Sequence, residues 1–137
     1  MACGVLEHVA DMGASLDEIR RVLVPRGQLF VFNLPQRYSY KELVIERLRL
    51  GHTHEHRFTG RSIEALLRTH GFRTLAVHRA GMVPHLATGL PPRWRQAYYR
   101  VSSGLYQADR VLSQTPVLNR IAQSLEVLAQ SVAPGAT

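Results

Sequence analysis

The chain has 137 residues, 45% of them hydrophobic, which is enough apolar material for one globular domain with a core. Its net charge of +7 comes mainly from arginines that are dispersed along the sequence, and because no nucleic-acid-binding motif accompanies them, we do not expect nucleic acid as a partner. A single cysteine excludes an internal disulfide, and no apolar run approaches the roughly 18 residues of a membrane-spanning helix, so we expect a cytoplasmic protein.

Helix and strand patterns alternate from the beginning of the chain. A helix is predicted at 15–23, where Ser15 caps the first turn and Glu18 completes a capping box. The short apolar run that follows at 28–34 is typical of a strand that is buried on both faces of a parallel sheet.

The same alternation continues to about residue 80. Amphipathic helices are predicted at 38–50 and 61–70, and Thr59 and Gly71 mark the start and the end of the second one. A second strand is predicted at 72–79. Strands and helices in this order predict an α/β fold with a mainly parallel sheet.

The second half of the chain has a different pattern. Prolines and glycines break up residues 83–92, which we interpret as a linker, and residues 133–137 form a short tail. Residues 93–132 carry two apolar stripes at helical spacing and predict a helical hairpin packed on the α/β domain. The aromatic side chains beside arginines in this region also suit a peripheral membrane contact or a partner-binding surface. The second predicted helix, which Thr115 and Pro116 would open, places these residues on one stripe: Leu118, Ile121, Leu125 and Leu128.

Four sequence blocks, taken in order, carry a resemblance to a known family. The blocks are Val-Leu-Glu-His-Val at 5–9, Leu-Asp-Glu-Ile-Arg-Arg-Val-Leu at 16–23, Pro-Arg-Gly at 25–27 before the apolar strand, and the stretch from Glu55 to Phe72. Together they resemble the second half of a class I S-adenosylmethionine-dependent methyltransferase domain. The resemblance covers residues 1–82 and implies a partial Rossmann-like, doubly wound sheet.

The resemblance also implies an activity and a set of site residues. The chain would be part of an enzyme that transfers a methyl group from S-adenosylmethionine to a small-molecule acceptor, with the cofactor at the carboxyl ends of the strands. Residues Val5, Leu6 and His8 would lie near the cofactor. Glu7 and His8 are the candidate catalytic residues, because methyl transfer can need a base and a histidine can accept a proton near neutral pH. The alternative is that both residues only form hydrogen bonds within their loop.

Histidines and glutamates in two places also invite a metal interpretation. In quinone-pathway O-methyltransferases a similar Glu-x-x-Glu-His arrangement is associated with a divalent metal, but Gly4 stands here where the first glutamate would be. The alternating His52, His54 and His56 offer imidazole ligands, yet the family block already accounts for the last of them. We therefore expect no metal, and this histidine run lines a substrate pocket or forms a polar loop.

Four further residues are candidates for binding the acceptor. Asn33, Arg37 and Tyr38 follow the strand at 28–34 at its carboxyl end, where this fold binds its substrates, and His56 joins them from the family block. Arg37 can meet an anionic group and Tyr38 an aromatic one. An exposed polar loop is the alternative for the three residues that follow the strand.

The family's glycine-rich cofactor turn is not found in this sequence, in which no Gly-x-Gly occurs. We therefore expect weak S-adenosylmethionine binding by the isolated chain: either the reading frame begins late, at an internal methionine, or another chain supplies the first half of the domain. The alternatives are a non-catalytic remnant or partner subunit, and a basic membrane- or partner-binding module. The strand at 28–34 would lose a neighbour, which predicts low stability, self-association or coverage of its open edge by the C-terminal helices.

Overall fold

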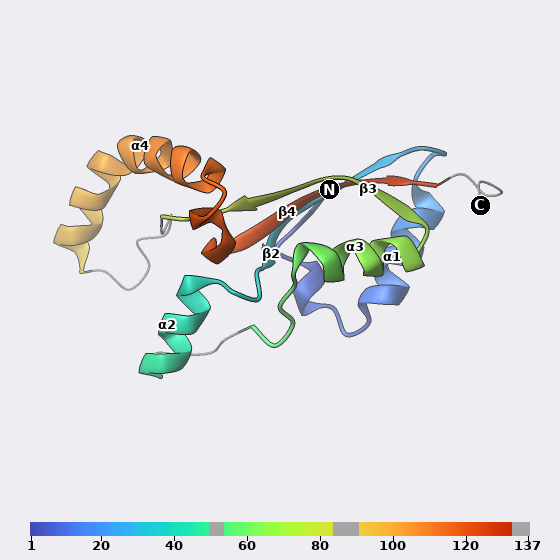
Figure 1. Cartoon of the computed structure of the whole chain (residues 1–137), viewed down its shortest axis with the longest axis horizontal. Coiled ribbons are helices and arrows are strands. Elements are labelled where there is room, and N and C mark those ends of the chain that lie inside the picture. Colours follow the sequence, from blue (N-terminus) through green and yellow to red (C-terminus); the bar gives the residue numbers. More distant parts are fainter. Residues whose placement is uncertain (50–53, 84–90, 133–137) are drawn as a thin grey trace.

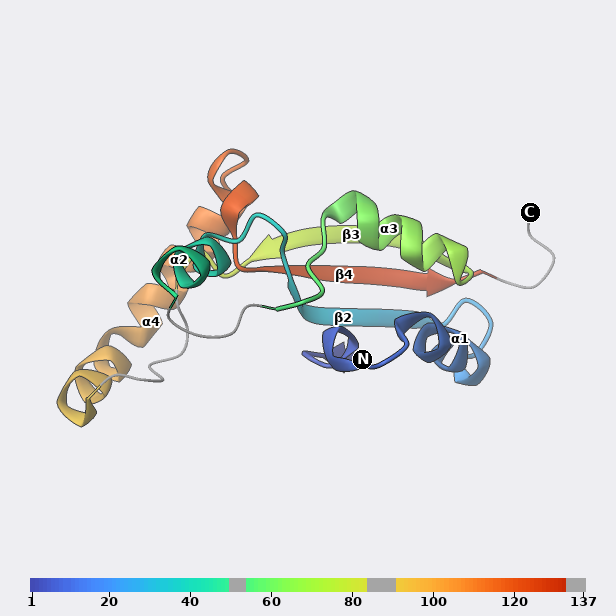
Figure 2. The same ribbon diagram turned by 90° about the horizontal axis from the view of Figure 1, so that it is seen from below.

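The computed structural model describes residues 1–49, 54–83 and 91–132 as a mixed α/β structure built on one four-stranded sheet. Helices α1 and α3 lie on one face of the sheet, whereas α2 and α4 lie beyond one of its ends (Figures 1 and 2). The elements in chain order are β1 (Ala2–Cys3), η1 (Leu6–His8), α1 (Met12–Val22), β2 (Gln28–Pro35), α2 (Tyr40–Leu48), α3 (Gly60–Thr69), β3 (Phe72–Ala80), α4 (Pro92–Gln114), η2 (Leu118–Ile121) and β4 (Ser124–Ser131).

The sheet has the strand order β1-β2-β4-β3. Strand β1 pairs in parallel with β2, whereas β4 is antiparallel to both β2 and β3. Only one of these three pairings is parallel, so the prediction of a mainly parallel set of pairings is wrong. Because β4 alone is reversed, β1, β2 and β3 still point in the same direction.

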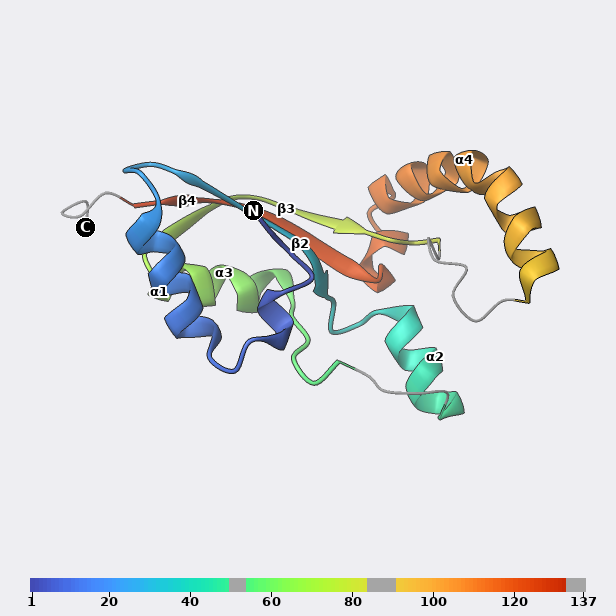
Figure 3. The ribbon, with the colours of Figure 1, turned by 180° about the vertical axis from the view of Figure 1, so that it is seen from behind.

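The core lies between the sheet and the two helices on one face. In β2, Leu29 and Val31 are buried, whereas Gln28 and Phe30 are exposed. The prediction that this strand is buried on both faces is therefore wrong. On the face opposite α1 and α3, the one described helix that contacts the sheet is α4, and it packs only against the end of β3 (Figure 3). The buried core contains Leu6, Leu16, Leu29, Val31, Leu34, Ile63, Leu67, Phe72, Leu125, Val127 and Ala129.

The C-terminal segment is a strand where a second helix of a hairpin was predicted. Burial alternates along β4, and the side chains of Leu125, Val127 and Ala129 point into the core. This period of two overrides the helical spacing of the leucines, since the strand gains a hydrogen-bonding partner on each side. Strand β4 pairs with one edge of β2, whereas on the other edge β1 pairs only with Val31 and Phe32. Within the described residues most of that second edge has no partner strand, as predicted, and α4 lies beyond the end of the sheet rather than over it (Figure 2).

Helix α1 is confirmed, but it starts three residues earlier than predicted. Asp11, not Ser15, is its N-cap, and its Oδ1 accepts a hydrogen bond from the Ala14 N–H at 2.9 Å. Ser15 donates back to the Asp11 carbonyl at 2.8 Å, and Glu18 pairs with Arg21. The predicted capping box at this helix is therefore wrong.

Helix α3 and strand β3 are confirmed close to their predicted bounds. Thr59 caps α3 with a reciprocal partner, Ser62. Gly71 has φ of +74°, the left-handed conformation expected of a helix terminator.

The two remaining helices are also present. Helix α2 is less amphipathic than predicted, because Leu43, Val44 and Leu48 are all exposed and its buried residue is Glu42. Helix α4 covers the first predicted stripe of the C-terminal region. Within the residues described, every helix is too short or too polar to cross a membrane. Residues 84–90 of the predicted linker and the tail at 133–137 lie outside the described residues.

Candidate functional site

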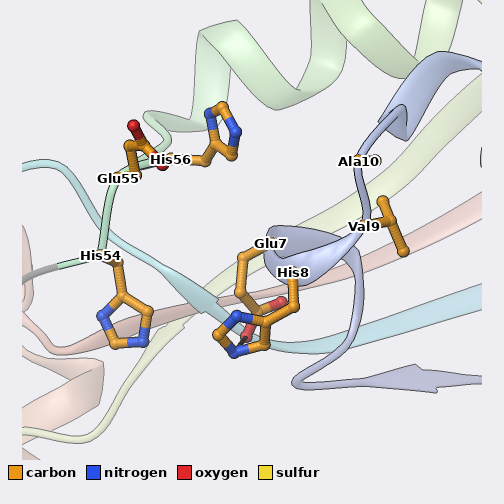
Figure 4. Close-up of a pocket in the computed structure, with 7 residues that line it drawn as sticks. All are labelled: Glu7, His8, Val9, Ala10, His54, Glu55 and His56. Atoms are coloured by element: carbon orange, nitrogen blue, oxygen red, sulfur yellow. Dashed lines mark ion pairs between the residues drawn. The ribbon is translucent and has the colours of Figure 1, made fainter.

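A pocket of about 570 Å³ lies where β1 and β2 end. Because these strands are parallel, the segments that follow them start at the same end of the sheet. Hydrogen bonds of 2.8 Å from the Arg37 N–H to the Phe58 carbonyl, and from the Phe58 N–H to the Pro35 carbonyl, bring the segment before α3 to this place. The lining residues come from η1 and from this segment (Figure 4): Glu7, His8, Val9, Ala10, His54, Glu55 and His56.

Glu7 is the most deeply buried charged group of the lining. Only 5% of its side chain is exposed, and Oε2 has no hydrogen-bond partner within the described part of the chain. Its Oε1 lies 3.9 Å from Nε2 of His8, whose side chain is 66% exposed. Because Oε2 has almost no accessible surface, a ligand in the pocket would meet the carboxylate on the side of Oε1, which faces His8.

His54 is held from behind by a second buried carboxylate, that of Glu42. The His54 ring nitrogen Nδ1 lies 2.8 Å from Oε1 of Glu42, and the His54 backbone N–H donates to Oε2 at 3.1 Å. Glu42 is 3% exposed. Ser39, the N-cap of α2, accepts a hydrogen bond from the Glu42 backbone N–H and fixes the start of the helix.

The two histidines face one another at one side of the pocket. The ring centroids of His8 and His54 are 6.1 Å apart, with an angle of 43° between the rings. Glu55 and His56 are exposed, and their side chains point away from this pair (Figure 4). His52 lies outside the described residues.

The structure brings together only some of the predicted site residues. Glu7, His8 and His56 line the pocket, whereas Val5 and Leu6 do not, and Leu6 is part of the core.

The other predicted acceptor-binding residues, one within β2 and two after it, also lie outside the lining. Asn33 has a left-handed backbone conformation, with φ of +58°, at an irregularity in β2, and its amide lies 4.0 Å from Sγ of Cys3. Arg37 and Tyr38 are exposed.

Glu42 is a site residue that the sequence interpretation missed. The spacing Ser39-x-x-Glu42 is that of a capping box, which accounts for the glutamate locally. In the structure the carboxylate binds His54 instead, twelve residues further along the chain. The contact joins residues twelve positions apart, and a bridge between Gln36 and Phe58 brings the segment after His54 beside the end of β2, so no local pattern in the sequence signals it.

The lining fits a small polar molecule better than a nucleoside cofactor. Its apolar side chains are those of Val9 and Ala10, which are too small to hold an adenine ring, and the sequence contains no glycine-rich turn. The described residues contain no group of three or more histidine, cysteine or acidic side chains that could hold a metal ion. No known protein family matches this sequence, and no curated protein matches it.

Proposed function

We propose that this chain forms the acceptor-binding part of a class I S-adenosylmethionine-dependent methyltransferase acting on a small molecule. The observation that carries the proposal is the position of Glu7 and His8. They belong to the block that resembles this family, and they line a pocket at the carboxyl ends of two parallel strands.

The direction of the strands supports the proposal. Strands β1, β2 and β3 run in the same direction, and β4 alone is reversed. Helices α1 and α3, which connect the strands of common direction, lie on one face, as in one layer of a doubly wound fold (Figure 1).

The chemistry that this pocket can perform is binding and deprotonation of the acceptor. Glu7 can accept a hydrogen bond from a hydroxyl or amine group, and a neighbouring imidazole can take the proton that such a group must lose when it is methylated. The pocket lining contains no residues suited to hold the nucleoside of the cofactor, so we propose that residues outside these 137 bind it.

The test uses a fusion in which the first half of a characterised class I methyltransferase precedes the whole chain. We expect calorimetry to detect micromolar S-adenosylmethionine binding by the fusion and millimolar or no binding by the chain alone. The fusion should then transfer radioactive methyl groups to members of a panel of phenols, hydroxy acids and amines. A folded fusion that binds the cofactor but methylates nothing would favour the non-catalytic alternative.

A second candidate function is favoured by the surface of α4. This helix extends away from the sheet (Figure 3), and its N-terminal half exposes Trp94 and Val101 beside Arg93, Arg95 and Arg100. The Arg93 guanidinium lies 6.0 Å from the Trp94 ring centroid. Such a helix fits the surface of an anionic membrane, where arginines meet the headgroups and the aromatic ring enters the interface.

Sedimentation with liposomes tests this second function. We expect the chain to pellet with anionic vesicles at 50 mM salt, to be released at 500 mM salt because the charges are screened, and not to pellet with neutral vesicles. Trp94→Ala should weaken the binding, whereas Gln107→Ala on the same helix should not. Equal pelleting at both salt concentrations would contradict an electrostatic contact.

A further inference from the structure

We propose that His54, oriented by Glu42, is the proton-accepting base of the pocket. We further propose that the acceptor is a neutral or cationic molecule with two hydrogen-bond-donating groups, one for His54 and one for Glu7. The inference rests on the proposed function and deepens it, because it assigns the base to a residue outside the Glu7-His8 block and limits the class of acceptor.

The contacts with Glu42 determine which nitrogen of the His54 ring carries the proton. An ionised carboxylate can only accept hydrogen bonds, and both oxygens of Glu42 are used by His54. The proton of a neutral His54 ring must therefore be on Nδ1, which leaves the lone pair of Nε2 available. Glu42 also stabilises the imidazolium that forms when Nε2 takes a proton.

Glu42 also fixes the orientation of the His54 ring. Two contacts to one buried side chain fix both the backbone and the ring of His54, and the ring turns its free edge toward His8 and the pocket (Figure 4). His8 has no comparable support, since its contact with Glu7 is 3.9 Å long and most of its side chain is in solvent. A base must be held in place to act efficiently, and of the two histidines His54 is the one that is held.

The hydrogen-bond acceptors of the pocket limit the class of ligand. The Glu7 carboxylate lines the pocket and can accept a hydrogen bond at Oε1, and a second donor must reach Nε2 of His54. The Glu7 carboxylate belongs to the lining, whereas Arg37, which was expected to meet an anion, does not. An anionic acceptor would be repelled, whereas a neutral diol, a phenol with a second hydroxyl or an amino alcohol would satisfy both groups.

The proposed proton transfer is balanced within the pocket. The O–H bond of the acceptor breaks, its electron pair stays on the acceptor oxygen, and a new N–H bond forms at Nε2 of His54. The negative charge of Glu42 is then paired with a full positive charge on the ring, and the acceptor oxygen becomes a nucleophile. No oxidant or reductant takes part.

The direct test is nitrogen NMR of the histidine rings in the full chain at pH 8, where imidazoles are ordinarily neutral. We expect His54 to carry its proton on Nδ1 and Glu42→Gln to lose this preference, because an amide can also donate. Glu46→Gln, one turn further along α2 and exposed, is the matched control and should leave the His54 signals unchanged. A wild-type ring with its proton on Nε2 would overturn the proposal.

Activity of the fusion described above separates this inference from the proposed function. If the fusion transfers methyl groups, His54→Gln should lower kcat by roughly 100-fold or more with little change in KM, as expected for the loss of a general base. Full activity of a folded His54→Gln fusion would overturn the role of His54 and leave the methyltransferase proposal intact. No activity in the wild-type fusion would count against the methyltransferase proposal, whereas the NMR result would still decide the orientation of His54.

Discussion

Tyr40 opens α2 and links it to the segment before β4. Its hydroxyl accepts a hydrogen bond of 2.9 Å from the Gln123 side-chain amide. Burial raises the pKa of Tyr40 above its usual value of 10.0; the hydrogen bond from Gln123 opposes this, and the charges of Asp109 and Tyr98 add to it. The neutral phenol is therefore favoured in the folded protein.

The raised pKa predicts a dependence of stability on pH. The stabilisation by Tyr40 should be fully present below about pH 10, the pKa of the phenol in the unfolded chain, and should be lost as the pH rises through the higher pKa of the folded protein. Between these two pKa values only the unfolded chain ionises, so the free energy of unfolding falls. Urea unfolding of the wild type and of Tyr40→Phe, each at about pH 8.5, 10 and 11, measures this. The free energy of unfolding of the wild type should fall relative to that of the variant. A difference that stays constant across these pH values would contradict the prediction.

Two glycines should respond in opposite ways to alanine. Gly71 has φ of +74°, so Gly71→Ala should lower the free energy of unfolding by about 1–2 kcal/mol, the cost of a left-handed non-glycine residue. Gly104 lies inside α4 with open space around its Cα, so Gly104→Ala should raise that free energy by about 0.5–1 kcal/mol. Chemical denaturation of both variants is the measurement, and effects of the same sign would contradict the local conformations.

Single residues could be predicted from the sequence where local geometry determines them. Thr59 and Gly71 mark the ends of α3 because a cap and a left-handed terminator act within a few residues. Glu42 and His54 could not be paired, because their contact depends on where distant segments of the chain come together. The placement of Glu7 and His8 in a pocket was predictable only through the family resemblance.

Two neighbouring residues of β4 face opposite sides of the sheet and should respond differently to substitution. Val127 is 2% exposed, so Val127→Thr buries a hydroxyl and should lower the free energy of unfolding by about 1–3 kcal/mol. The neighbouring Glu126 lies on the other face of the strand, and Glu126→Thr should stay within about 0.5 kcal/mol of the wild type. Urea denaturation of the two variants distinguishes this strand from the predicted helix, in which Val127 would lie off the apolar stripe and be replaceable.

The C-terminal segment was misassigned because its sequence fits two periods. Leu118, Ile121, Leu125 and Leu128 are spaced like one face of a helix, whereas residues 124–131 also alternate between apolar and polar positions over most of their length. Local pattern cannot decide between the two. The segment becomes a strand because its backbone groups pair with β2 on one side and with β3 on the other. This pairing is a property of the tertiary structure.

For the whole molecule, the class of fold was predictable and the sheet was not. Alternating helices and strands indicated an α/β structure, and the strands at 28–35 and 72–80 are where the patterns place them. Strand order and direction depend on which segments meet. The alternation at 124–131 is compatible with a strand, but it does not indicate that this strand would lie between β2 and β3. The candidate site depends on that topology, because it forms where β1 and β2 end together.

The sheet leaves an apolar surface on the face opposite α1 and α3. Phe30 is 40% exposed and stacks on Phe32 with ring centroids 6.0 Å apart, and Leu128 lies beside Phe30 in the neighbouring strand. An apolar surface of this kind favours association with a second copy of the chain, because each copy buries the other's rings. The net charge of +7 opposes this association by repulsion between copies.

These two effects predict that association increases with salt. At about 10 mM salt the charges act over about 30 Å and should keep the chain monomeric, whereas at about 500 mM salt they are screened and dimers should form at about 100 μM protein. Sedimentation velocity at both salt concentrations measures this. Phe30→Lys should weaken the dimer by roughly tenfold or more, since it removes apolar burial and adds a charge. Gln28→Lys adds the same charge two residues away on the same face and is the control. Similar losses of dimer in both variants would point to charge repulsion alone. A wild-type chain that stays monomeric at high salt would show that this surface does not pair.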